Sequence, residues 1–276
     1  MGKSDVSDRA LRKLLVVKPG ERVDLATFDC GATFGRQKDE AEDVLAGNLA
    51  RLSDLQSRIW AEAKHAVLIV LQGIDAAGKD GTIKAIAGAF NPQGTPVTSF
   101  KEPTPEELAH DFLWRVHAAV PEKGDIGIFN RSHYEQVLIV RVHALEPEAR
   151  WRNHYREIRD WERMLTDEGV TILKFFLAID KDTQRQRFQD RIDDPAKNWK
   201  FKPSDVAERK LWDQYQSAFQ DMLTETSTDF APWYSIPCNR NWFRNLAISE
   251  IVADALTELN PRYPDPAPGI KGLKIV

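Results

Sequence analysis

The chain alternates short apolar segments with longer segments in which apolar residues recur every three or four positions. The short segments lie at 66–71, 95–100, 126–130 and 171–179, and they have the length and composition of strands. The longer segments have the periodicity of helices with one buried face. Because strands and helices alternate, we expect an α/β fold with a parallel sheet covered by helices on both faces. Ligands bind to such folds beyond the carboxyl ends of the strands.

The longest predicted helix extends from about Lys38 to Ala63. Within it, apolar side chains repeat at intervals of three and four residues: Leu45, Leu49, Leu52, Leu55 and Ile59. These side chains share one face of a helix, and we expect that face to pack on the core or to contact a second copy in a homo-oligomer. Another helix is predicted after Thr104, because Thr104, Pro105 and Glu107 form a capping-box signature.

The pattern divides the chain of 276 residues into three parts. Residues 1–63 are expected to form an N-terminal extension and the long helix, packed on the core. Residues 64–260 are expected to form the core, with a lid at about 181–210. Residues 261–276 begin with several prolines and have the composition of a tail. With 42% apolar residues, the chain has enough apolar side chains for a sizeable core.

Composition and charge argue against several classes of protein. The longest purely apolar run, 66–71, is far too short to cross a bilayer, so no membrane association is expected. A net charge of −4 argues against a general nucleic-acid-binding protein, which would need a basic excess. The first residues lack the apolar core of a secretion signal. Cys30 and Cys238 lack metal-ligand spacing, and we expect free thiols in a reducing, cytoplasmic compartment.

The most specific chemical signal follows the strand at 66–71. A loop with the spacing GxxxxGK, formed by Gly73, Gly78 and Lys79, leads into a helix. In such loops the backbone N–H groups and the positive end of the helix point at a phosphate, and the lysine reaches over it. Phosphoryl chemistry is therefore the first hypothesis, with these residues as the expected phosphate-binding set: Gly73, Ala76, Ala77, Gly78, Lys79, Asp80, Gly81 and Thr82.

The loop departs from the usual pattern in its acidic residues. Asp80 stands where a Ser or Thr hydroxyl normally binds Mg²⁺, and Asp75 lies within the loop. Carboxylates repel phosphate unless a cation lies between them. We therefore expect Asp75 to hold Mg²⁺, and Mn²⁺ is also compatible with such a site. The alternative is that Asp75 is a solvated loop residue and that Asp80 only complements the helix dipole.

A second group of polar residues follows the strand at 126–130. Asn130, Arg131 and Ser132 are delivered to the sheet edge that carries the phosphate loop. Arg131 would then reach the transferring phosphate, where its fork of donors matches phosphate oxygens. Glu135 follows within one turn and is a second candidate metal ligand. Alternatively, Arg131 and Glu135 only pair with each other on a helix surface.

The third group is the basic stretch at 184–202. It contains six Lys or Arg against three Asp, so it is locally +3 in an acidic chain. Arg187 and Arg191 lie on one face of a predicted helix, and Lys200 follows. A basic segment in this position suits a lid that closes over a polyanion and excludes water. The alternative is a solvated charged face, with Trp199 and Phe201 serving as packing residues.

Four motifs in chain order closely resemble those of the polyphosphate kinase 2 family. They are GIDAAGKDGTIKAI, FNRSHYEQVLIVRV, RIDDPAKNWKF and TSTDFAPWYSIPCNRNWFRNLAI, and the resemblance extends from about Phe28 to about Leu259. The family resembles thymidylate kinases in fold. The resemblance therefore implies a P-loop kinase fold: a three-layer α/β/α sandwich with a five-stranded parallel sheet and a helical lid.

The resemblance also implies an activity and a set of site residues. Family members transfer phosphate between inorganic polyphosphate and a nucleotide with Mg²⁺, and the FNRSHYE form resembles the branch that uses both nucleoside monophosphates and diphosphates. By resemblance, the catalytic residues are Asp75, Lys79 and Arg131, while Arg187 and Arg191 match lid positions that grip phosphate. Many members have an acid where this chain has Asn130, and this difference directs attention to Glu135 as a metal ligand.

Two other classes of function share part of this signature. An ATP-dependent nucleotide or nucleoside kinase would share the fold and the loop, but it would favour one triphosphate donor and need fewer basic lid residues. A non-enzymatic P-loop nucleotide switch would combine slow turnover with partner binding. The guanine-reading NKxD pattern is absent, which argues against a GTPase-like switch in particular.

Overall fold

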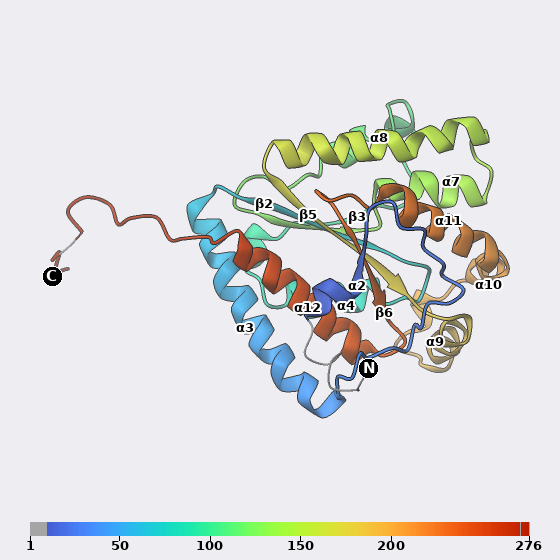
Figure 1. The fold of residues 1–276 in the computed structure, drawn as a ribbon, viewed down its shortest axis with the longest axis horizontal. Helices are drawn as coiled ribbons and strands as arrows, with labels where there is room; N and C mark the ends of the chain where they lie inside the picture. The colour runs from blue at the N-terminus through green and yellow to red at the C-terminus, as the bar shows by residue number, and fades with distance from the viewer. Residues whose placement is uncertain (1–9, 271, 276) are drawn as a thin grey trace.

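The computed structural model describes residues 10–270 and 272–275, and it has a central sheet between two groups of helices (Figure 1). Within the described residues the sheet has six strands in the order β1-β6-β5-β2-β4-β3. The strands are β1 (Val16–Val17), β2 (Ala66–Gln72), β3 (Val97–Ser99), β4 (Ile126–Asn130), β5 (Val170–Ala178) and β6 (Trp233–Pro237). The four strands expected from the apolar segments are all present.

The sheet differs from the expected one in its strand number and in its edge. β2 lies between β4 and β5 and is parallel to both, β3 is parallel to β4, and β6 is parallel to β5. β1 is antiparallel to β6, with Val16 opposite Tyr234 and Val17 opposite Trp233. The expected sheet of five parallel strands was therefore too small: five of the described strands are parallel to one another, and β1 adds a sixth, antiparallel strand, which makes the sheet mixed. The short N-terminal strand pairs with the backbone groups of an edge that would otherwise be exposed.

The helices flank the sheet on both faces (Figure 1). On one face lie α2 (Leu11–Leu15), α3 (Lys38–Glu62), α4 (Lys79–Ala87) and α12 (Asn241–Glu258). The other face carries α8 (Glu148–Asp167) and α11 (Trp212–Thr226). The shorter elements are α5 (Pro105–Leu108), α6 (Trp114–His117), α7 (Ile139–Val142), α9 (Lys181–Asp193) and α10 (Pro203–Lys210), with 3₁₀ turns η1 (Pro92–Gly94), η2 (His133–Val137) and η3 (Asn198–Lys200).

The central strand β2 contributes to both hydrophobic cores. Its side chains alternate, so Val67, Ile69 and Leu71 pack toward α3 and α12. Leu68 and Val70 pack toward α8 and α11. Every residue of β2 is buried, as expected for a strand covered on both faces. This burial fixes the carboxyl end of β2, from which the phosphate loop starts.

The long helix α3 nearly matches its predicted bounds. Leu52, Leu55 and Ile59 are buried, and the helix packs along α12. Leu45 and Leu49, nearer its N-terminus, are only partly buried. The predicted stripe therefore packs on the core, and contact with a second copy stays a prediction.

The expected parts of the chain lie as follows. The segment expected to form the lid, about 181–210, folds as α9, η3 and α10. The described part of the tail after residue 260 has no helix or strand and projects from the body (Figure 1). Residues 1–9 of the expected extension and residues 271 and 276 of the tail lie outside the described residues. No helix among those described is long and apolar enough to cross a membrane.

Candidate active site

The phosphate loop lies between the end of β2 and the start of α4. Gly73 follows the strand, and a Cβ there would approach Leu177 O to 2.8 Å, so a larger residue would not fit. Gly78 caps α4 with a φ of 108°, which favours glycine. The loop thereby turns sharply and presents its N–H groups at the N-terminus of α4. This is the arrangement that binds phosphate in P-loop proteins.

Lys79 is folded over the loop. Its Nζ donates hydrogen bonds to Gly73 O (2.6 Å) and Ile74 O (3.3 Å), and only 8% of the residue is exposed. Burial, followed by the positive charge of Arg131, lowers the pKa of Lys79 to about 8. An anion bound in the loop would favour the charged form of this lysine. Thr82 is also buried, and its hydroxyl donates to Gly78 O rather than to the loop opening.

Arg131 joins the phosphate loop to the segment after β4. Its guanidinium donates to Asp75 Oδ1 (2.5 Å) and to Glu135 Oε2 (3.2 Å). The pairing of Arg131 with Glu135 is therefore present, but the arginine also reaches across to the loop. Arg131 has a φ of 62°, which is uncommon for a residue other than glycine. Such a conformation persists only where the surrounding structure holds it.

The two carboxylates beside Arg131 are the candidate metal ligands. Burial by itself would raise the pKa of Asp75, but the nearby positive charges, that of Arg131 first, lower it below its usual range. Asp75 is therefore deprotonated at neutral pH, as a metal ligand must be. Among the described residues no group of three or more His, Cys, Asp or Glu side chains is placed to hold a metal by itself. One or two carboxylates fit Mg²⁺ when substrate phosphates complete its coordination.

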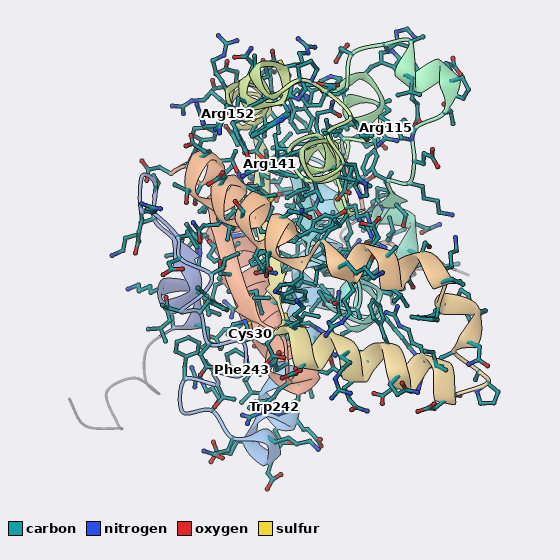
Figure 2. The ribbon with its side chains drawn as sticks, turned by 90° about the vertical axis from the view of Figure 1, so that its right-hand side faces the viewer. Cys30, Arg115, Arg141, Arg152, Trp242 and Phe243 are labelled. Carbon is teal, nitrogen blue, oxygen red and sulfur yellow. The ribbon has the colours of Figure 1, made fainter. Side chains whose placement is uncertain are left out.

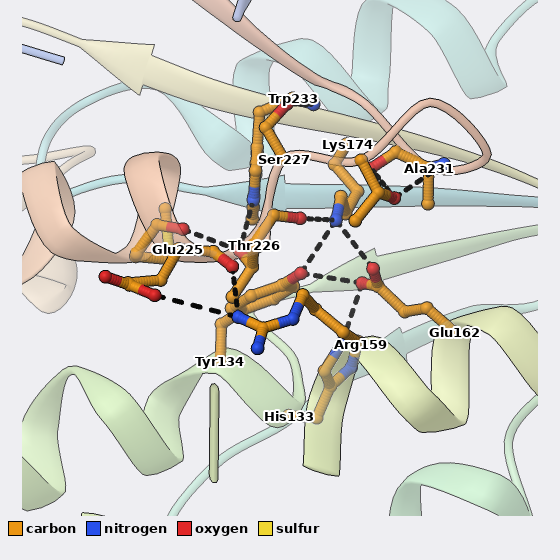
Figure 3. A network of polar contacts seen from close by, with 12 residues as sticks. His133, Tyr134, Arg159, Glu162, Lys174, Glu225, Thr226, Ser227, Ala231 and Trp233 are labelled. Carbon is orange, nitrogen blue, oxygen red and sulfur yellow. Dashed lines mark hydrogen bonds and ion pairs between the residues drawn. The ribbon is translucent and has the colours of Figure 1, made fainter. Parts of the chain in front are cut away.

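The segment that carries Arg131 is anchored by a buried polar network (Figure 3). Glu162 of α8 accepts hydrogen bonds from Tyr134 Oη (2.7 Å) and from Lys174 Nζ (2.6 Å), and it lies 3.3 Å from His133 Nε2. Lys174 Nζ also donates to Thr226 O (2.8 Å). The side chains of Lys174, Glu162 and His133 are fully buried. His133 and Tyr134, which follow Arg131 closely, thus contact Glu162 of α8. Through Lys174 of β5 they are also linked to the end of α11.

The lid arginines differ in what they contact. Arg187 Nη1 donates to Ala76 O (2.8 Å) and Ala77 O (3.1 Å), so it supports the loop through its carbonyl groups. Arg191 lies over the ring of Phe188 and is close enough to Asp75 to contribute to its lowered pKa. Asn130 Nδ2 donates to Asp80 Oδ1 (3.0 Å), which holds that carboxylate against the end of β4.

A strongly basic cavity of about 650 Å³ opens beside the phosphate loop. Its volume lies within the roughly 300–1,000 Å³ of ligand sites in proteins. Three aspartates, Asp75, Asp80 and Asp190, contribute to its lining. Eight cationic side chains also line it: Lys79, Arg131, Arg187, Arg191, Lys197, Lys200, Lys202 and Arg244. The structure thus places part of the candidate set around one cavity suited to a polyanion: Asp75, Ala76, Gly78, Lys79, Asp80, Gly81, Arg131, Arg187, Arg191 and Lys200. Gly73, Ala77, Thr82 and Glu135 do not line it.

Sequence reasoning missed some residues of this cavity. Lys197 and Lys202 belong to the basic stretch that was singled out, but they were not identified individually. Arg244 and Asn241 come from the start of α12. They fall inside the last of the four motifs, but no spacing rule connects them to a loop so much earlier in the chain. Glu135 lies with Asp75 and Arg131 in a separate small space beside α9, α10 and α11.

Comparison with known proteins identifies the family. The model of the Polyphosphate kinase 2 (PPK2) family matches residues 35–264. This chain belongs to the polyphosphate kinase 2 family. It is 52% identical over 252 residues to the AMP/ADP-polyphosphate phosphotransferase of Meiothermus ruber, a match that covers 91% of this chain and 94% of that protein. It is 44% identical over 265 residues to the ADP-polyphosphate phosphotransferase of Rhodopseudomonas palustris, covering 91% and 92% of the two chains.

Its fold also matches that of a polyphosphate kinase 2 solved by crystallography. The Arthrobacter aurescens protein aligns with a TM-score of 0.91 at 39% sequence identity, covering 95% of this chain and 94% of that one. The family assignment inferred from the four motifs is therefore confirmed. Members of this family are phosphotransferases, and the enzyme class expected from the phosphate loop is confirmed with it.

Proposed function

We propose that this polyphosphate kinase 2 family member transfers the terminal phosphate of inorganic polyphosphate to AMP and to ADP, reversibly and with Mg²⁺. The observation that carries the proposal is the cavity beside the phosphate loop, in which eight cationic side chains face three aspartates. The name of the Meiothermus ruber relative, an AMP/ADP-polyphosphate phosphotransferase, supports the double acceptor range. Guanine nucleotides are alternative acceptors under the same proposal.

The charge of this cavity favours a polyphosphate donor over ATP. A nucleoside triphosphate carries a few negative charges at one end and an apolar base at the other. The cavity instead draws its cations from the phosphate loop, the segment after β4, α9 to η3 and the start of α12. Trp199 is its exposed aromatic residue, so stacking of a base is less supported than binding of a linear anion. The confirmed enzyme class argues against the non-enzymatic switch, and the experiment below distinguishes polyphosphate from ATP as the donor.

In the proposed mechanism, the terminal phosphates lie in the loop formed by residues 73–82. The N–H groups at the start of α4 bind their oxygens, and Lys79 turns from its carbonyl partners toward the phosphate chain. Arg131 is held between Asp75 and Glu135 and offers its fork to the transferring group. Donors fixed in advance at the place where charge develops lower the barrier, because they need no reorganisation during the reaction.

The acceptor needs orientation more than it needs a base. A nucleotide phosphate oxygen is already anionic near neutral pH, so an in-line attack depends on positioning and charge neutralisation. When bound, Mg²⁺ would be held by Asp75 and Glu135 and would neutralise charge on the phosphates. The histidines have other partners: His133 approaches Glu162, His143 approaches Glu208, and His110 stacks on Trp114. A catalytic histidine is therefore not part of the proposal.

A second cavity supports acceptor binding on the far side of Glu135. It has a volume of about 160 Å³ and lies between the segment around α5 and α6, the η2 turn, and α8. His133 Nδ1 is buried there without a hydrogen bond within the described residues, and His154 Nε2 lies 3.8 Å from the carboxylates of Glu146 and Glu157. Arg115 lies at its wall, where it pairs with Glu107 (3.3 Å). Buried polar atoms without a partner are expected where a polar ligand binds.

The fold supports a lid that closes over the donor, as in thymidylate-kinase-like proteins. In this proposal α9, η3 and α10 form the lid, because they carry Arg187, Arg191 and Lys200 to the open side of the cavity. Closure would exclude water and so prevent hydrolysis of the donor. A cytoplasmic location and a homo-oligomeric state stay predictions from the sequence.

The function is tested with purified protein, Mg²⁺, long-chain polyphosphate and either AMP or ADP, in the absence of ATP. Chromatography of the nucleotides is expected to show ADP and ATP from AMP, and ATP from ADP. A Lys79→Ala variant is expected to lose nearly all transfer. If the wild-type protein forms no product with polyphosphate but transfers phosphate from ATP, the polyphosphate proposal fails and an ordinary nucleotide kinase is favoured. Binding of nucleotide without turnover of either donor would favour the switch.

A further inference from the structure

Arg244 lies directly against the phosphate loop although it comes from the distant helix α12. It is 4% exposed. A Cβ on Gly78 would overlap its Nη1 atom, and a Cβ on Gly81 would lie 3.0 Å from Nη2. Glycine at both positions therefore leaves room for the guanidinium beside the N-terminus of α4. The close fit places a fixed positive charge at the point where the loop would hold phosphate.

The guanidinium of Arg244 has neutral partners. It donates to Asn241 Oδ1 (2.8 Å) and, through Nε and Nη2, to Asn245 Oδ1 (3.2 and 2.9 Å). No Asp or Glu of the described ranges forms an ion pair with it. Three of the five N–H groups of an arginine are used in these bonds, which leaves two for a ligand. A buried cation without a counter-ion is destabilising, and an anionic ligand would offset that destabilisation.

Asn241 links Arg244 to the lid. Its Oδ1 atom also accepts a hydrogen bond from Arg187 Nη2 (3.1 Å). The same arginine of α9 contacts the loop carbonyls, so the two arginines flank the loop from different elements and share one acceptor. Both side chains line the basic cavity. The side-chain amide of Asn241 therefore positions both Arg187 and Arg244 where α9, the phosphate loop and α12 meet.

The start of α12 is held firmly enough to fix Arg244. Phe243 is fully buried and packs on Phe34, with 6.0 Å between ring centroids. Figure 2 shows Phe243 and Trp242 side by side at this end of the helix, and their rings form an edge contact at 5.8 Å. Because its neighbour is anchored in the core, Arg244 presents its guanidinium without a large loss of side-chain entropy on binding.

We propose that Arg244 is a binding residue for the polyphosphate donor, contacting the phosphate chain beside the N-terminus of α4. This inference rests on the proposed function and extends it, because it names a residue that distinguishes a linear polyanion from the acceptor nucleotide. In this proposal the positive charge of Arg244 acts on the polyphosphate donor in the basic cavity. The acceptor pocket around His133 and His154 lies on the far side of Glu135 and has no contact with Arg244 among the contacts described.

The test uses Arg244→Gln, which removes the charge, and Arg244→Lys, which keeps it. For Arg244→Gln we expect the KM for polyphosphate to rise about tenfold or more, while the KM for ADP changes by less than about twofold. Arg244→Lys is expected to fall between this variant and the wild type. The rise in melting temperature that polyphosphate causes should also be much smaller in Arg244→Gln. Arg51→Gln is the control for loss of an arginine charge outside the cavity. Arg51 lies on α3 and pairs with Asp254 of α12, the helix that carries Arg244.

A second variant keeps the charge of Arg244 but is designed to shift its guanidinium. Gly81→Ala adds a methyl group facing Arg244 Nη2 and favours the helix. We expect it to raise the KM for polyphosphate in the wild-type background but not further in the Arg244→Gln background, as contacting residues are non-additive. If Arg244→Gln does not fold, the effect of Gly81→Ala is measured in the Arg244→Lys background, where a non-additive rise in the KM for polyphosphate supports the role of Arg244 and an additive rise overturns it.

Two outcomes separate this inference from the function on which it rests. If the wild-type protein does not use polyphosphate, the proposed function fails. If the wild type uses polyphosphate and folded Arg244→Gln keeps its KM within about twofold, only the role of Arg244 is overturned. In that case the arginine supports the loop without touching the donor.

Discussion

At the residue scale, the environment of Lys79 makes its protonation sensitive to a bound anion. In the free protein it is buried against carbonyl oxygens, and its pKa lies at about 8 instead of its ordinary value of 10.5. The charged form is thus disfavoured in the fold, and stability gained from neutral Lys79 appears as the pH rises from about 8 to about 10.5. A phosphate chain bound in the loop would reverse this preference, because its negative charge favours the protonated lysine.

Binding of polyphosphate should therefore cause proton uptake. Between pH 8 and 9 we expect the wild-type protein to take up part of a proton when long-chain polyphosphate binds without nucleotide. Calorimetry in two buffers of different ionisation enthalpy measures that number. Lys79→Arg is the control, because arginine stays charged at these pH values and removes the uptake. Equal uptake in both proteins would mean that Lys79 does not change its protonation on binding.

At the scale of elements, the segment after β4 depends on a network that lies outside the cavity. Arg131 adopts a positive φ, and the next residues are held by the Lys174–Glu162 pair through His133 and Tyr134 (Figure 3). Removing one partner of a buried ion pair leaves an uncompensated charge. The network therefore affects both the stability of the sheet and the position of Arg131.

Glu162→Ala should lower the free energy of unfolding by about 3–5 kcal/mol. Urea unfolding measures this change, provided that the variant retains native circular dichroism. Arg152→Ala is the control on the same helix: Arg152 and Glu148 form an exposed pair, which contributes less than about 1 kcal/mol (Figure 2). A loss in Glu162→Ala no larger than that of the control would show that the network contributes little.

At the scale of the whole molecule, the site is built from segments far apart in the sequence. The phosphate loop, the lid helix α9 and the start of α12 meet at the carboxyl ends of β2, β5 and β6. A chain with a net charge of −4 thereby gathers eight of its 38 Lys and Arg residues around one cavity. Binding of a polyanion to such a cavity should weaken with salt, because exposed charges are screened at higher ionic strength.

Arg191→Ala should weaken the use of polyphosphate more than the binding of nucleotide. We expect the KM for polyphosphate to rise several-fold, and its dependence on NaCl between about 50 and 200 mM to become shallower, since one screened charge is lost. The KM for ADP should change little. Steady-state kinetics at several salt concentrations measure these effects. Equal losses for donor and nucleotide would contradict the assignment of Arg191 to the donor.

The sequence by itself determined the class of the fold and the chemistry of the loop. Apolar runs and helical periodicity are local properties, and the spacing of Gly73, Gly78 and Lys79 is local as well. These patterns were enough to locate four strands and the long helix, and they predict a phosphate site. The motif order was enough to place the chain in its family, which the comparisons confirm. The roles of the individual site residues stay predictions that the experiments above test.

Only the tertiary structure decided which distant side chains meet. The pairing of β1 with β6 depends on an edge that the sequence does not mark, because a two-residue strand carries almost no periodicity. The contact of Arg244 with Gly78 arises where α12 passes the phosphate loop. The bridge from Arg131 to Asp75 arises in the same way, because β2 and β4 are neighbours in the sheet. Such contacts follow from the packing of whole elements, and no spacing along the chain encodes them.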